Sequence, residues 1–94
     1  MTPEERIYRG ARAKEIIESD VFQDAFTAIE TEVIEQWKNS PARDEAGRQS
    51  LWQYLKLLEK LRANLQSTME TGKLAQLDLL HKESLRDRLR AVIG

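Results

Sequence analysis

The stretch LWQYLKLLEKLRANLQSTM, residues 51–69, decides the fold of this chain. Its seam residues recur at spacings of three and four positions, which is the heptad period of a helix with one apolar side. Leu55 and Leu57 widen this seam on both shoulders. Because a stripe this wide is unstable in water, it predicts packing against helices of the same chain or of another copy. The predicted oligomer seam consists of Leu51, Tyr54, Leu58, Leu61 and Leu65, together with Trp37 and Trp52.

The composition around this stretch predicts a single all-α domain. The 94 residues are 40% hydrophobic and 33% charged, with only four glycines and two prolines to interrupt helices. Most of the other residues are good helix formers, and β-branched residues are scattered rather than clustered. This length allows one modest core and is too short for two.

Local signals divide the chain into four predicted helices. Thr2-Pro3-Glu4-Glu5 forms a capping box, and Ser19 can restart the chain, although the sequence leaves open whether the first helix breaks there. Ser40-Pro41 ends the second helix and can cap the third, with Asp44 as a competing cap. Gly72 is typical of a left-handed C-cap that ends the third helix. The predicted helices cover residues 3–18, 20–39, 41–71 and 74–92.

A short turn between two amphipathic helices favours an antiparallel arrangement. The second helix carries its own apolar stripe, formed by Phe22, Phe26, Ile29, Val33 and Trp37. The predicted fold is therefore an antiparallel helical hairpin of residues 20–39 and 41–71, flanked by N-terminal and C-terminal helices in a small helical bundle. The sequence leaves open whether the first helix packs on its own chain or on a neighbour.

Charge is distributed unevenly although the net charge is only −1. Residues 1–47 carry six basic and eleven acidic side chains, and residues 48–94 carry nine basic and five acidic ones. This polarity could steer association between copies, or the two halves could neutralise each other within one fold. The predicted partner-binding residues are Asp20, Asp24 and Glu35 on the acidic side and Lys82, Arg86 and Arg90 on the basic side.

The sequence has few catalytic or metal-ligating residue types, so we expect no enzyme activity, no cofactor and no metal. The chain has no cysteine, and His81 is the one histidine. Asp78-Leu79-Leu80-His81 is a single Asp-x-x-His motif without the second copy that a di-metal bundle needs. Thr71-Gly72-Lys73 lacks the further glycine of a phosphate-binding loop. With no long apolar run, we also expect no membrane contact and an intracellular, non-secreted protein.

Several stretches resemble small uncharacterised helical proteins that tailed bacteriophages and prophages encode. The resemblance covers most of residues 8–75 and implies a phage protein, encoded among head and packaging genes, in the host cytoplasm or the virion. It implies no active-site residues. The stretches that carry it are Gly10-Ala11-Arg12-Ala13 with Ile16, Phe22 with Ala25-Phe26, Glu35-Gln36-Trp37, Ser40-Pro41-Ala42-Arg43-Asp44 and Thr71-Gly72-Lys73.

The function hypothesis from these patterns is a non-enzymatic phage structural or assembly protein. It would act by helix-mediated self-association, as a homo-oligomer, and by docking on a larger protein partner. One alternative is a small inhibitor or adaptor that binds a host or phage enzyme. Another is a DNA-packaging accessory that contacts nucleic acid through its arginines, which the near-neutral net charge disfavours.

Overall fold

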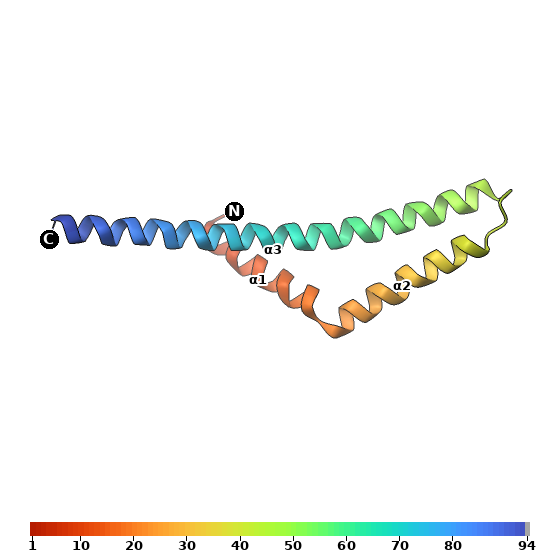
Figure 1. Cartoon of the computed structure of the whole chain (residues 1–94), viewed down its shortest axis with the longest axis horizontal. Coiled ribbons are helices and arrows are strands. Elements are labelled where there is room, and N and C mark those ends of the chain that lie inside the picture. Colours follow the sequence, from red (N-terminus) through yellow and green to blue (C-terminus); the bar gives the residue numbers. More distant parts are fainter. Residues whose placement is uncertain (94) are drawn as a thin grey trace.

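The regular structure in residues 1–93, which the computed structural model describes, is entirely helical. Three helices follow one another: α1 (Pro3–Glu18), α2 (Asp20–Asn39) and α3 (Glu45–Ile93). The all-α prediction is therefore confirmed. The predicted small bundle is not what forms, because the molecule is an extended body of 77 × 25 × 18 Å (Figure 1).

One serine makes the corner between α1 and α2. The Ser19 hydroxyl accepts a hydrogen bond from the backbone N–H of Phe22 at 3.3 Å, and the Ser19 N–H donates to the Ile16 carbonyl at 3.2 Å. Gln23 then donates from its side chain to the Ile17 carbonyl at 3.0 Å. Ser19 thus caps both helix ends, and the chain breaks here rather than running on.

The third helix starts later than predicted. Residues 41–44 form a turn, in which the Asp44 N–H donates to the Pro41 carbonyl at 3.0 Å. The Asp44 carboxylate accepts from the backbone N–H of Gly47 at 3.1 Å. Asp44 therefore takes the cap that Ser40 was also able to supply, and the predicted start at residue 41 is wrong.

Gly72 does not end a helix. Residues 45–93 form one continuous helix of 49 residues, and no glycine in the described part of the chain has positive φ. The predicted C-cap is wrong, and the predicted fourth helix, 74–92, is the second half of α3. The physical reason is a helix crossing: a Cβ atom on Gly72 would lie only 2.8 Å from both the Gly10 Cα and the Arg6 carbonyl oxygen. The glycine permits backbone contact here, which is a different use from a left-handed cap.

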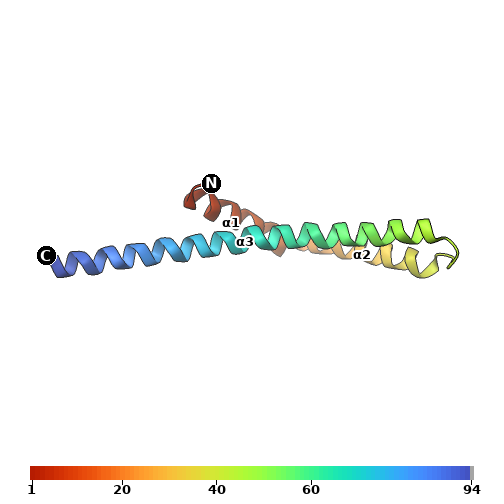
Figure 2. The same cartoon turned by 90° about the horizontal axis from the view of Figure 1, so that it is seen from above.

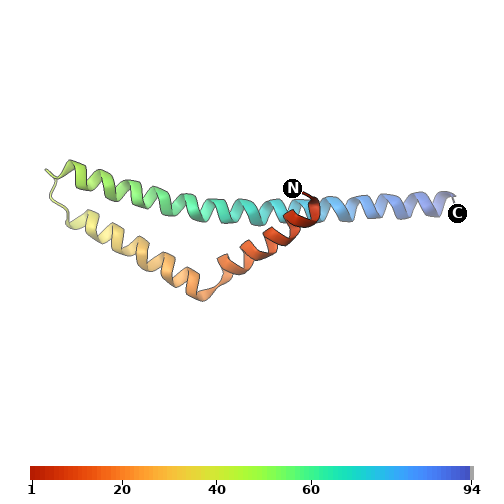
Figure 3. The same cartoon turned by 180° about the vertical axis from the view of Figure 1, so that it is seen from behind.

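The three helices enclose a triangle with one long side. α1 crosses α3 at the Gly10–Gly72 contact, where Gly10, Ala13 and Gly72 are buried (Figure 3). α2 runs back beside the first half of α3 (Figure 2). Past the crossing, α3 continues alone, and every residue from 80 to 92 is exposed. We call residues 80–92 the arm.

Candidate protein interaction site

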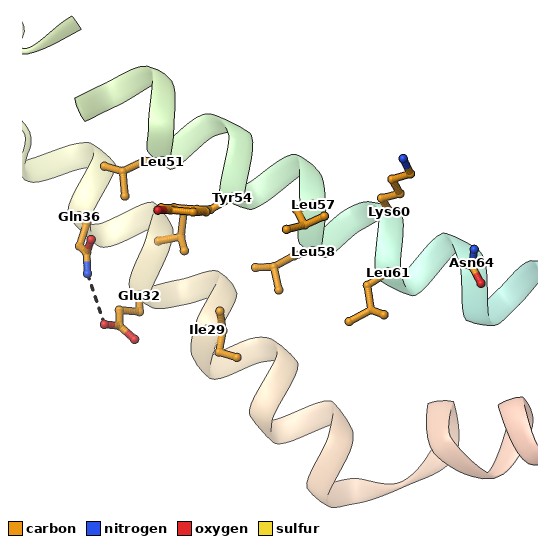
Figure 4. Close-up of a pocket in the computed structure, with 11 residues that line it drawn as sticks. Ile29, Glu32, Gln36, Leu51, Tyr54, Leu57, Leu58, Lys60, Leu61 and Asn64 are labelled. Carbon is orange, nitrogen blue, oxygen red and sulfur yellow. Dashed lines mark hydrogen bonds between the residues drawn. The ribbon is translucent and has the colours of Figure 1, made fainter. Parts of the chain in front are cut away.

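An apolar groove lies between α2 and the first half of α3. It has a volume of about 660 Å³, and no residue of α1 lines it. Figure 4 shows Ile29 of α2 opposite Leu58 and Leu61 of α3, with Tyr54 and Leu57 further along the same wall. The full lining is Ile29, Glu32, Val33, Gln36, Leu51, Tyr54, Leu57, Leu58, Lys60, Leu61 and Asn64.

The groove is built from side chains that the fold leaves half covered. Four of its large apolar residues remain exposed: Ile29 by 47%, Tyr54 by 58%, Leu57 by 64% and Leu61 by 50%. By contrast, Phe26, three residues before Ile29 on α2, is only 4% exposed. The layer is two helices wide but only one helix thick, so one side of each stripe is covered by the neighbouring helix and the other side has no cover from the described chain (Figure 1 and Figure 4).

A carboxylate and an ammonium group flank the groove on opposite edges. Glu32 lies at the outer edge of α2, and Lys60 at the outer edge of α3 (Figure 4). Glu32 accepts a hydrogen bond from Gln36 at 3.3 Å. Within residues 1–93, neither Glu32 nor Lys60 belongs to any of the three salt bridges. The groove thus has an apolar floor, one acidic rim and one basic rim.

The opposite side of the α2–α3 layer carries the two tryptophans. Trp37 and Trp52 line one smaller pocket with Val33, Ile34, Leu51 and Leu55, so the structure places both near the α2–α3 turn. Both indoles stay partly exposed. The Arg48 guanidinium lies 4.4 Å from the centre of the Trp37 ring and donates to the Ser40 hydroxyl at 3.0 Å and carbonyl at 3.3 Å. Arg48 therefore holds the turn closed on this side.

The residues of the predicted oligomer seam differ in their burial. Leu51, Leu58 and Leu65 are half-buried within the molecule, whereas Tyr54 and Leu61 are exposed in the groove. The structure thus uses part of the seam within the chain. Leu57, which the sequence reading treated as a shoulder, is among the most exposed apolar residues of the groove.

The predicted acidic and basic partner surfaces lie on different parts of the molecule. Asp24 and Glu35 lie about 200° and 180° around α2 from the buried Phe26, and so face away from α3. Asp20 is exposed at the start of the same helix. Lys82, Arg86 and Arg90 are exposed along the arm, and Lys82 pairs with Asp78 at 3.1 Å. The fold brings none of the acids to the arginines.

A second apolar stripe starts on α3 before the arm and continues along it. Leu74 lies about 200° around α3 from Gly72, so the stripe that starts with it faces away from the α1 crossing. Nothing else in the described chain covers it. The exposed members are Leu74, Leu77, Leu80, Leu85, Leu89 and Val92.

Other kinds of site have less support. Among residues 1–93, no group of three or more metal-ligating side chains comes together. His81 is exposed on the arm. None of the described helices has a stretch long and apolar enough to cross a membrane. Comparison with protein-family models, with curated proteins and with solved structures finds no match to this chain.

Sequence reasoning missed the two charges at the groove. The acids of α2 were selected because acidic residues are numerous in that segment, and these acids face away from the apolar stripe. Glu32 lies three residues after Ile29, and Lys60 lies between Leu57 and Leu61, so both directly border apolar positions. A search for charges beside an apolar stripe, rather than opposite it, would have selected them.

Proposed function

We propose that this chain is a non-enzymatic assembly protein that acts by helix-mediated self-association and by docking on a larger partner. One observation carries this proposal. Large hydrophobic side chains in the described chain are mostly exposed: sixteen of them are exposed, whereas Phe26 is the single large one that is buried. Monomeric soluble proteins rarely leave contiguous apolar surface uncovered, and such surface marks protein interfaces.

Ten of these sixteen exposed residues lie on two separate surfaces, which supports two roles. The groove between α2 and α3 is concave and lies beside Phe26, the one buried apolar side chain of that layer. The arm is a single convex helix with four exposed apolar residues of the stripe and a basic ridge. A groove suits a helical partner, and a lone amphipathic helix suits a groove on another protein. We therefore assign self-association to the groove and docking on the larger partner to the arm.

The resemblance to small phage proteins supports a place for this chain in phage assembly. An elongated helical protein is suited to connecting other proteins. The proposal assigns no catalytic residue and no cofactor. The arm's Lys82, Arg86 and Arg90 would then contact an acidic surface of the partner rather than nucleic acid.

The proposal is tested by the mass of the purified protein in solution across a concentration series, measured by light scattering after size exclusion. We expect a multiple of the 10.9 kDa chain mass that dissociates on dilution. Leu57→Gln, in the groove, is expected to shift the protein towards monomer, whereas Thr31→Gln, exposed on α2, is expected to leave the mass unchanged. A monomer at every concentration would contradict self-association and favour the inhibitor or adaptor hypothesis.

A further inference from the structure

The groove between α2 and α3 has the features of half an interface. In a bundle of four helices each helix contacts two neighbours, but α2 and the first half of α3 have only each other beside the groove. Ile29, Tyr54, Leu57 and Leu61 are the residues that a second pair of helices would cover. A second layer of two helices would cover the groove and complete the core.

We infer that the groove is filled by the same groove of a second copy, with a twofold axis running along it, and that Glu32 of each copy pairs with Lys60 of the other. This inference rests on the proposed self-association and names its partner and geometry. With such an axis, α2 of one copy lies over α3 of the other, and the two arms leave the dimer at the same end. The result is a four-helix core with an isologous interface.

The charges at the two rims of the groove favour a second copy of the chain over any other occupant. Glu32 borders the α2 edge of the groove and Lys60 the α3 edge. A twofold axis along the groove exchanges the two edges, so the acidic rim of each copy meets the basic rim of the other. Both charged side chains line the same groove. The same groove is therefore self-complementary in charge as well as in apolar surface.

The size of the face suits a stable dimer. The 20 residues of α2 make a helix about 30 Å long. Two helices side by side, each about 10 Å across with its side chains, make the layer about 20 Å wide, so it offers about 600 Å². A typical specific interface buries about 800 Å² on each partner. No segment of α1 lines the groove, so the second copy can approach without moving the helix crossing.

A charge exchange tests this geometry. Glu32→Lys alone places two lysines opposite each other at both edges of the interface, and Lys60→Glu alone places two carboxylates there. Each single variant is expected to raise the dimer dissociation constant about tenfold at low ionic strength, with a smaller effect at high salt. An equal mixture of the two variants is expected to form heterodimers with nearly the wild-type constant, because both contacts then join opposite charges. Asp24→Lys, on the outer side of α2, is the matched control and is expected to dimerise like the wild type.

The mixture excludes an explanation within one chain. If Glu32 and Lys60 mattered only to each other inside a monomer, each chain in the mixture would keep its own mismatch and heterodimers would gain nothing. Wild-type protein that oligomerises, with single variants and mixtures unaffected, would overturn the twofold geometry and leave self-association standing. Wild-type protein that stays monomeric would overturn both.

Cross-linking identifies the occupant independently. The chain has no cysteine, so engineered ones report single contacts. Glu32→Cys mixed with Lys60→Cys is expected to give a disulfide-linked heterodimer faster than either variant alone. Preferential linkage of Leu85→Cys to Lys60→Cys would instead place the arm of another copy in the groove, and would overturn the inference.

Discussion

The helix crossing and the groove solve the packing of α3 in opposite ways. At the crossing, two glycines let the backbones touch, and Gly10, Ala13 and Gly72 are buried between α1 and α3. In the groove, large side chains hold α2 and α3 together along one edge and leave much of their surface exposed. The small residues are therefore buried within one chain, whereas the large residues of the groove still have apolar area to bury.

The largest effect is expected from overfilling the crossing. Gly72→Leu places a side chain where even a Cβ would lie 2.8 Å from the Gly10 Cα, so α1 must separate from α3. We expect the backbone amides of α1 to lose hydrogen-exchange protection, with a loss of about 3 kcal/mol in the free energy of unfolding. Tryptophan emission should change little, because both tryptophans lie at the far turn.

Glu70→Leu is the matched control for this substitution. Residue 70 lies about 200° around α3 from Gly72 and is exposed, so the same leucine there meets no backbone. Protection of α1 should be retained. Equal loss of protection in both variants would show that the crossing depends on features other than the close approach of the two glycines.

A smaller effect is expected from truncation within the α2–α3 layer. Phe26→Ala removes the one large side chain that is buried among residues 1–92. It should lower the free energy of unfolding by about 2–3 kcal/mol with α1 still docked, less than in a closed core because a site in a single two-helix layer can collapse. Ile29→Ala, at a residue that is 47% exposed, should cost about 1 kcal/mol in the monomer. Urea unfolding at concentrations below dimerisation, followed by circular dichroism, measures both. Similar costs for the two variants would mean that the groove is covered in the monomer.

The smallest effect is expected on the arm. Leu85→Gln with Leu89→Gln keeps helix propensity and removes apolar surface that touches no other element. The free energy of unfolding should change by less than about 0.5 kcal/mol. The same urea titration tests this, and a loss above 1 kcal/mol would indicate that the arm folds back or packs between copies.

The helical class of the chain was predictable because it depends on composition and on periodicity, which are local. The break at Gly72 was wrongly predicted because a glycine before a lysine has the same local pattern as a C-cap. Only Gly10, far away in the sequence, explains why Gly72 stays inside a helix. Ser40 and Asp44 likewise offered equivalent caps, and the Pro41–Asp44 turn decided between them.

The candidate site was predictable only in part for the same reason. Periodicity identified the apolar residues of α2 and α3. It could not predict that Leu58 is half-buried whereas Leu61 and Tyr54 are exposed. That division depends on how far α2 diverges from α3, and the divergence is set by the Ser19 corner and by where α1 crosses α3. The rim charges were missed because their importance arises from two helices meeting, not from either helix alone.

Because α3 is unbroken, it fixes both the distance and the rotation between the groove and the arm. Between Leu61 in the groove and Leu85 on the arm, each residue contributes about 1.5 Å of length and about 100° of rotation. One residue added beyond the crossing would turn the arm's stripe by more than a quarter of a circle, whereas seven added residues would lengthen the arm by about 10 Å and nearly restore its direction. The spacing and orientation of whatever the two ends hold are thus encoded in residue count.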